Sequence, residues 1–270
     1  MKNLVLIDFT EESKHALKYA IEFTKSINGT LELVNVCDYH DFSRSYTALE
    51  ELRNRFSTDD FQLTINELFG KVEEDLPKYV NNDKIGFIFC GTHDIKFLER
   101  VFSSRILRLM NHMHANVVFI PPTLEIFRPV KHVLAPILMD KHSLQKLEVL
   151  RYLRNFMEFE LTLCTHRDEK VDINQQLFMA KRILDKAGIP FEIKYISNSE
   201  SDLKREIDEY AETIHADLIS IVNFTESQIF NFTTKGFVEG LIRNKHKIPI
   251  LAVQNKSLEE YSGFHTAGGY

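Results

Sequence analysis

Short continuous apolar runs alternate along the chain with stretches in which apolar residues recur every three or four positions. The runs predict buried parallel strands, and the periodic stretches predict amphipathic helices that cover both faces of a sheet. In the first half we expect strands at about 3–9, 30–37, 61–67, 84–91 and 116–121, and helices at about 11–27, 46–57, 71–81 and 103–113. In the second half we expect strands at about 132–138, 157–164, 189–197, 216–222 and 249–254, and helices at about 143–156, 172–187, 201–214 and 234–245.

Local signals place some of these helix ends. Glycine tolerates the left-handed conformation that often ends a helix, so Gly29 is predicted to end the first helix in this way. Gly188, followed by Ile189 and Pro190, marks the same kind of stop before the middle strand of the second half.

The chain also repeats itself. Residues 3–27 and residues 132–156 both read as a strand, a short turn and an amphipathic helix. The ends of the two halves also match, because 111–122 and 243–254 each read as a helix tail followed by an apolar strand. A repeat of this length indicates two copies of one domain.

We therefore expect an α/β protein with two tandem five-stranded parallel-sheet domains and flanking helices. The first domain covers residues 1–125 and the second covers 130–256, with a semi-rigid linker at 122–129 that has a proline at each end. Residues 257–270 contain three glycines, lack periodicity and form a C-terminal tail.

The last strand of each half bears on assembly. Both are short and apolar, with VVFI at 117–120 and ILAV at 250–253. Because an unpaired apolar edge promotes aggregation, we expect the two edges to pair within the chain as a pseudo-dimer, with self-association into a pair-based homodimer as a further possibility.

Composition excludes several classes of partner and compartment. The net charge of −6 and the pI near 6.0 argue against nucleic acid and against an anionic membrane surface. No apolar stretch reaches the length of a membrane span, and the N-terminus turns acidic too early for a signal peptide. Cys37, Cys90 and Cys164 all fall in or beside apolar runs, which is typical of free thiols. We expect a cytoplasmic protein.

Candidate chemistry gathers where the strands of the first half end, since ligands of open parallel sheets bind at that edge. Asp8, Phe9 and Thr10 lie at the end of the first strand, and Val36 and Cys37 lie at the end of the second. The fourth strand ends in Cys90 and Gly91, followed by Asp94, and the next helix opens with Ser103, Ser104 and Arg105. A glycine turn with hydroxyl residues at a helix start can cradle phosphate. It can also be a simple helix cap at Ser103.

The opening VLIDFTEESKHALKYA and the stretch from CGTHD to SSRILRLMNHMHANVVFIPP resemble the universal stress protein family, and the resemblance extends through both halves. It implies an adenine-nucleotide alpha-hydrolase-like fold, commonly paired through the last strand. Nucleotide-binding members of the family have an aspartate at the end of the first strand. Their phosphate loop is spaced glycine, two residues, glycine, nine residues, glycine, and then serine or threonine.

This chain matches that pattern in part. Asp8 matches the aspartate, Gly91 the first glycine and Ser104 the hydroxyl residue. Asp94 replaces the second glycine, and Ser103 replaces the third after a spacer that is one residue short. A carboxylate about 4 Å from a phosphate charge costs about 4 kcal/mol at an effective dielectric constant of about 20. Mg²⁺ or Arg105 could offset that repulsion.

The second half departs further from the pattern. Leu138 stands at the aspartate position, Val222 and Thr225 at the first two glycines, and Phe237 after the surviving Gly236. Any ATP or AMP is therefore expected to bind weakly and in the first domain only.

The resemblance implies a non-enzymatic stress-response protein with at most one degenerate adenine-nucleotide site and an unknown protein partner. The main alternative is an interaction or scaffold module whose cleft is filled by side chains. A slow ATPase is a third hypothesis, disfavoured because no general base is identifiable. No catalytic residue is predicted. No metal site is predicted either, because His112 and His114 fall two apart at a helix end and face different directions.

Overall fold

The computed structural model describes residues 1–37, 42–92, 102–122, 124, 127–138, 141–167, 173–198, 200–223 and 237–254. The predicted tail and Asp94 lie outside these ranges. In the first half the structure has β1 (Lys2–Leu6), α1 (Glu11–Ser26), β2 (Thr30–Cys37), α2 (Phe42–Phe56), β3 (Leu63–Phe69), α3 (Val72–Asn82), β4 (Phe87–Gly91), α4 (Phe102–Leu109), the 3-10 turn η2 (Met110–His112) and β5 (Asn116–Ile120).

The second half repeats this order. Its elements are β6 (His132–Pro136), the 3-10 turn η3 (Lys141–Leu144), α5 (Lys146–Arg154), β7 (Glu160–His166), α6 (Asn174–Ala187), β8 (Phe191–Ser197), α7 (Glu200–Thr213), β9 (Leu218–Asn223), α8 (Phe237–Ile242) and β10 (Ile250–Gln254). Helix and strand therefore alternate as the periodicity predicts.

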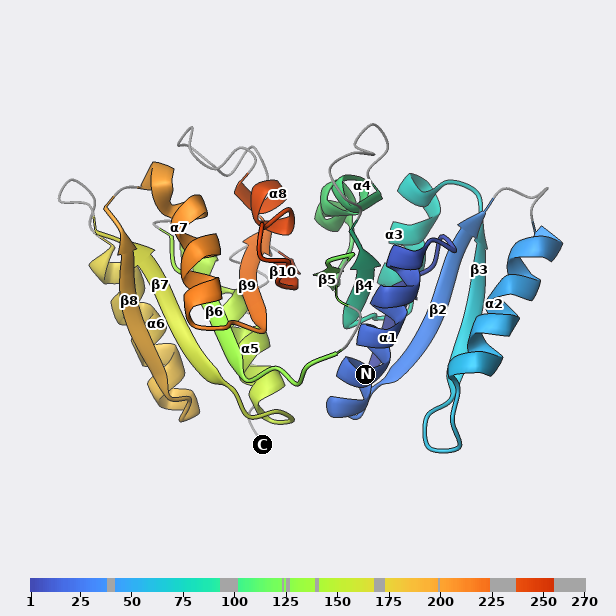
Figure 1. Cartoon of the computed structure of the whole chain (residues 1–270), viewed down its shortest axis with the longest axis horizontal. Coiled ribbons are helices and arrows are strands. Elements are labelled where there is room, and N and C mark those ends of the chain that lie inside the picture. The colour runs from blue at the N-terminus through green and yellow to red at the C-terminus, as the bar shows by residue number, and fades with distance from the viewer. Residues whose placement is uncertain are drawn as a thin grey trace.

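The described strands form one ten-stranded sheet in the order β3-β2-β1-β4-β5-β10-β9-β6-β7-β8 (Figure 1). Each half has its strands parallel, with the first strand of the half in the middle. The halves meet where β5 pairs antiparallel with β10, with Val118 opposite Leu251. The predicted fold class, two parallel five-stranded units paired through their last strands, is confirmed.

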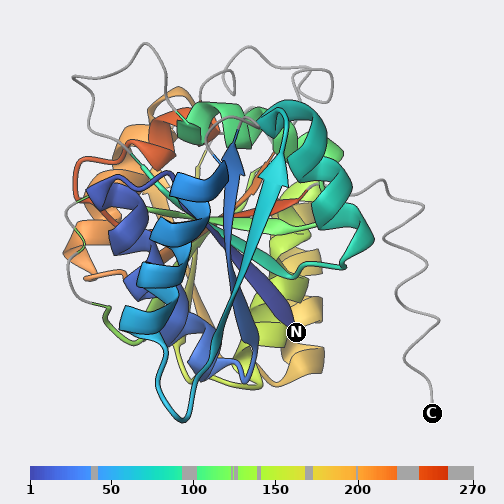
Figure 2. The ribbon, with the colours of Figure 1, turned by 90° about the vertical axis from the view of Figure 1, so that its right-hand side faces the viewer.

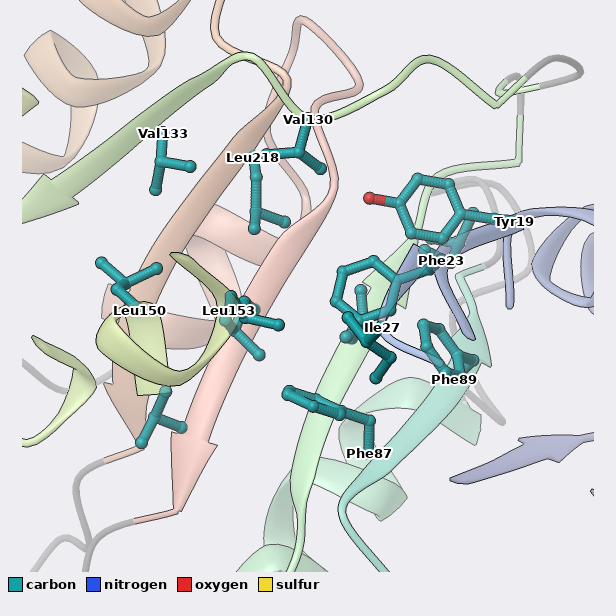
Figure 3. Close-up of a cluster of buried hydrophobic side chains, with 14 of the residues drawn as sticks. Tyr19, Phe23, Ile27, Phe87, Phe89, Val130, Val133, Leu150, Leu153 and Leu218 are labelled. Carbon is teal, nitrogen blue, oxygen red and sulfur yellow. The ribbon is translucent and has the colours of Figure 1, made fainter. Parts of the chain in front are cut away.

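Helices cover both faces of this sheet, and Figure 2 shows α1 and α2 on one side of β2 and β3 with α3 on the other. Two apolar clusters follow the two faces across both halves. One joins α1, α2, α5 and α6, and the other joins α3, α4, α7 and α8. Figure 3 shows part of the first cluster, in which Phe23 packs edge-on against Phe87 and Phe89 at ring distances of 5.5 and 5.3 Å. Each cluster therefore ties the two halves together.

The end of α1 differs from the prediction. Asn28, not Gly29, has the left-handed backbone, with φ of 52°. Asparagine tolerates this conformation well among non-glycine residues. Gly29 is needed for another reason, because a β-carbon there would lie 2.8 Å from Asn3 Nδ2 and 3.0 Å from the Met1 carbonyl oxygen. At the other predicted stop, Gly188 does cap α6 with φ of 65°.

The pairing of β5 with β10 leads to a prediction about the isolated first half. A fragment of residues 1–125 exposes the β5 edge, whose residues Val117 to Ile120 are buried in the whole chain. It should therefore self-associate, because its backbone donors and apolar side chains lose their cover. Light scattering at micromolar concentration checks this, with the whole chain as control. A soluble monomeric fragment would contradict the prediction.

Candidate nucleotide pocket of the first half

The turn between β1 and α1 holds the first group of predicted site residues. Oδ1 of Asp8 accepts hydrogen bonds from the backbone N–H of Thr10, at 3.1 Å, and from the Thr10 hydroxyl. The Thr10 hydroxyl oxygen in turn accepts the N–H of Ser13 at 3.3 Å and so caps α1. This network explains why an aspartate and a threonine stand here, and it fixes the Asp8 carboxylate at the end of β1.

Phe9, between these two residues, has an unusual backbone. Its φ is 64°, in the left-handed region that a bulky residue rarely adopts. Such a conformation costs about 1–3 kcal/mol and is concentrated at functional sites. The strained turn places Phe9 in the wall of a pocket.

That pocket lies between α1, the end of β2 and α2, and has a volume of about 750 Å³. Its lining combines apolar side chains, three cations, one carboxylate and small polar groups: Phe9, Lys14, Asn35, Val36, Cys37, Arg44, Ser45, Ala48, Glu51, Leu52 and Arg55. Of the residues that the sequence places at these strand ends, Phe9, Val36 and Cys37 belong to it. Lys14 pairs with Glu11 at 2.6 Å, and Arg44 and Arg55 outnumber the one carboxylate of the lining, so the pocket suits an anion that also carries an apolar part.

Hydrogen bonds hold the floor of the pocket in place. Asn35 Nδ2 donates to the Ile7 carbonyl oxygen at 2.6 Å, which ties the end of β2 to β1. Cys37 Sγ donates to Oε1 of Glu67 at 3.2 Å, and the Ser45 hydroxyl donates to the same oxygen. The buried Glu67 carboxylate on β3 therefore joins β2 to α2 beneath the pocket.

Gly91 has a packing role that the sequence does not reveal. A β-carbon at this position would lie 2.5 Å from the carbonyl oxygen of Glu12 and 3.1 Å from the backbone N of Ser13. Only glycine lets the first turn of α1 lie so close to the end of β4. This close packing alone explains why position 91 is a glycine, so the glycine is not by itself evidence of a phosphate site. The same packing brings the ends of β1 and β4 together.

Cys90 is buried beneath this turn. Burial raises the pKa of its thiol, and the nearby Asp8 carboxylate raises the pKa further. The thiol therefore stays protonated and is not a nucleophile. Its electrostatic interaction with Asp8 supports the expected convergence of these two strand ends.

The remaining residues of the predicted phosphate loop are described only in part. Asp94 lies outside the described residues, and Ser103 and Ser104 are described by their backbone alone, in the first turn of α4. Arg105 on α4 forms an ion pair with Glu73 at 2.8 Å, which links α4 to α3. The phosphate loop stays a prediction.

Sequence reasoning missed the contribution of α2. Arg44, Ala48, Leu52 and Arg55 all line the pocket from this helix. Their spacing of four, four and three residues puts them on one helix face, a pattern that can be read from the sequence. A helix face with two arginines is usually solvated, however, and only the fold shows that this one turns toward the strand ends.

The second half has the same arrangement of strands as the first, but different residues stand at the positions that line the pocket of the first half. Hydrogen bonds align its β6 and β7 with β1 and β2, so that Thr165 takes the place of Asn35 and donates to the Ile137 carbonyl oxygen at 2.8 Å. His166 takes the place of Val36 and is buried. Within the described residues, neither of its ring nitrogens has a hydrogen-bond partner.

Val222 stands at the place of Gly91, as the pairing of β9 with β6 shows. Its side chain occupies space that Gly91 leaves to the first turn of α1. Correspondingly, the predicted helix at 143–156 starts late, with η3 before it and α5 beginning at Lys146. Leu138 and Phe237 are buried as well, whereas Thr225 and Gly236 lie outside the described residues.

Two further findings limit the possible sites. Within the described ranges, histidine, cysteine and acidic side chains do not gather in groups of three or more that could hold a metal ion. Across those same ranges, every helix is too short or too polar to cross a membrane.

Comparisons with known proteins agree with this architecture. A universal stress protein from Archaeoglobus fulgidus DSM 4304 aligns with a TM-score of 0.77 and 15% identity, over 94% of this chain and 98% of that one. A functionally unknown protein from Pseudomonas aeruginosa PAO1 aligns with a TM-score of 0.60 and 13% identity, over 99% and 97% of the two chains. The cytoplasmic domain of a prokaryotic cation chloride cotransporter aligns with a TM-score of 0.53 and 11% identity, over 93% and 95%.

No curated protein sequence matched the chain. The structural matches at these identities show the fold. The sequence model of the universal stress protein family, in contrast, matches residues 1–121 directly. Residues 1–121 are therefore similar in sequence to the universal stress protein family, and the second half repeats the fold of the first.

Proposed function

We propose that the protein is a non-enzymatic stress-response regulator whose first half binds an adenine nucleotide, ATP or AMP, in the pocket between α1, β2 and α2. The observation that carries this proposal is the lining of that pocket. Phe9, Val36 and Leu52 offer apolar surface for a base, and Lys14, Arg44 and Arg55 offer positive charge for phosphates.

The asymmetry of the two halves supports a single site. Asp8 and Gly91 of the first half are replaced by the buried Leu138 and Val222. With apolar side chains packed at these positions, the second half serves as a fixed partner that completes the sheet. The alternative interaction role fits this half best.

The pocket also favours binding over catalysis. Along the described part of its lining, Glu51 is the one carboxylate and histidine is absent. General acid–base catalysis needs a positioned proton donor and a positioned proton acceptor. The described lining does not hold two carboxyl or imidazole groups that could fill these roles. We therefore propose a sensor of nucleotide level in the cytoplasm, read by a partner protein.

Calorimetry with ATP tests the proposal. We expect binding in the range of tens of micromolar, about −6 kcal/mol, strengthened by Mg²⁺. Asp8→Ala should abolish binding, and Asp8→Asn should weaken it at least tenfold while keeping the acceptor for Thr10. Asp94→Gly should tighten binding several-fold by removing a like charge. Unchanged affinity in both Asp8 variants would place the nucleotide elsewhere.

The arginines of α2 give a second test with a matched control. Arg44→Gln and Arg55→Gln should each weaken ATP binding several-fold, because each removes a charge from the pocket lining. Arg53→Gln changes the same helix but removes a side chain that pairs with Glu50 outside the pocket, and should leave affinity unchanged. Binding should also weaken as salt rises, because the phosphate contacts are ionic and the pocket is open to solvent. Equal effects of all three substitutions would contradict the proposed location.

A further inference from the structure

A second pocket, of about 550 Å³, lies where the two halves meet, away from the strand ends that form the first. Tyr19 of α1 comes from the first half, and Leu124 and Arg128 come from the segment that joins the halves, beneath the centre of the molecule in Figure 1. The second half supplies the end of α7 and the approach to β10: Ala211, Glu212, His215, Ala216, Asp217, His246, Lys247, Ile248 and Pro249.

The hydroxyl of Tyr19 is the first unusual feature of this pocket. Tyr19 is 2% exposed, and within the described ranges its hydroxyl has no hydrogen-bond partner. Figure 3 shows the oxygen pointing away from Phe23 and Phe89, toward Val130 and Leu218 of the second half. Burial raises the pKa of this phenol, and Asp217 raises it further, so the group stays protonated. A buried hydroxyl is normally paired, so the Tyr19 hydroxyl is a candidate contact for a bound ligand.

Asp217 is the second feature. Its Oδ2 accepts the backbone N–H groups of Lys131 at 2.9 Å and of His132 at 3.0 Å, so the carboxylate is held firmly at the start of β9. Asp217 and Tyr19 both line the pocket, and the carboxylate acts electrostatically on the phenol. A carboxylate and a phenol oxygen in the lining of one pocket suit a ligand group with several N–H donors, such as an ammonium.

A further cation of the lining can receive an anion. Arg128 is a permanent cation with an exposed side chain, and the carboxylate of Glu212 pairs with His246. Apolar side chains of Leu124, Ile248 and Pro249 complete the lining. The pocket therefore combines a place for a positive group, a place for a negative group and an apolar surface.

The corresponding place in the first half lacks these features. Aligned backbone hydrogen bonds put Gly86 where the second half has Asp217, and the Met1 side chain fills the space beside Gly86. When the strand alignment that matches Ile7 with Ile137 is continued along the chain, Val149 stands where the first half has Tyr19. The junction pocket is thus particular to one side of the molecule.

We propose that the junction pocket binds a small zwitterion, an α-amino acid with an aliphatic side chain. Its ammonium group binds between Asp217 and the Tyr19 hydroxyl, and its carboxylate binds Arg128. The side chain packs on Leu124, Ile248 and Pro249. Because the ligand contacts α1, the joining segment and α7, its binding stiffens the junction of the halves.

The test uses the full chain and L-leucine, with isopentylamine and 4-methylpentanoate as probes that each lack one charged group. Calorimetry and thermal unfolding should show binding and a rise in melting temperature with leucine, and at least tenfold weaker binding of the two probes. Absence of any response at about 10 mM leucine, or equal binding of all three compounds, would overturn the proposal.

Tyr19→Phe separates a binding role from a packing role. Losing an unpaired buried hydroxyl should raise the melting temperature of the free protein, while leucine binding falls about tenfold. Asp217→Asn and Arg128→Gln should weaken leucine binding to a similar extent, and Tyr152→Phe, on α5 outside the pocket, should not. Leucine binding by Tyr19→Phe as tight as by the original protein would also overturn the proposal.

Discussion

Replacing Lys146 by methionine is expected to raise the free energy of unfolding by about 2–4 kcal/mol near pH 7.5. Lys146 lies on α5 and is 1% exposed. When the strand alignment of Ile7 with Ile137 is continued along the chain, Lys146 corresponds to Ala16 of the first half. Its ammonium group donates to the Ser143 carbonyl oxygen, the one hydrogen bond seen for it among the described residues. Burial lowers the pKa of Lys146 from 10.5 to about 7. Methionine fills a similar volume without a charge to desolvate.

The same substitution should change how stability depends on pH. Between pH 7 and 10.5 the unfolded chain holds a proton on Lys146 that the folded chain has released. Stability therefore rises with pH through this window, by at most about 1.4 kcal/mol per pH unit from this group. Below pH 7 both states are protonated, and this contribution no longer changes.

Urea unfolding at pH 6.5, 7.5 and 9 measures both effects. The methionine variant should be more stable at each pH and should lose this part of the slope. Lys181→Met on α6, where the lysine is exposed, is the control and should keep the original slope. A Lys146 variant that is less stable, or that has the original slope, would show that the ammonium group is well accommodated.

Replacing Gly91 by alanine should lower the free energy of unfolding by about 2–3 kcal/mol. The added β-carbon would lie 2.5 Å from the Glu12 carbonyl oxygen and 2.7 Å from its carbon, and both are backbone atoms that cannot rotate away. The first turn of α1 must therefore move off β4. Because Thr10 caps that turn and bonds to Asp8, ATP binding should weaken as well.

Gly188→Ala is the matched control for this prediction. A β-carbon at position 188 would have no other atom within 4 Å, and the φ of 65° there costs a side chain only about 1 kcal/mol. Urea unfolding of both variants separates a steric clash from backbone strain. If Gly91→Ala costs no more than Gly188→Ala, then α1 does not depend on close contact at Gly91.

Much of the fold can be predicted from the sequence because its signals are redundant. Apolar runs mark each strand and helical periodicity marks each helix. Because the two halves repeat, each element is predicted twice. Errors occur where two residues compete for one role. Asn28 and Gly29 can both end a helix, and only the approach of Met1 and Asn3 shows that Gly29 is needed for space.

The site is less predictable, because it depends on which helix face turns toward the strand ends. Phe9 and Val36 could be predicted from the sequence, because they lie at the ends of predicted strands. The role of Arg44 and Arg55 depends on the packing of α2 across β2, and no local pattern distinguishes them from a solvated face. Lys146 is likewise unexpected, because a lysine beside an apolar stripe normally reaches solvent.

Photolabelling with 8-azido-ATP, followed by mass spectrometry of the peptides, tests the central claim that one half has a nucleotide pocket. The account predicts label in peptides from β2 and α2, residues 30–56, with competition by ATP and reduced labelling in Arg44→Gln. Label confined to the second half, or label that ATP does not displace, would contradict it.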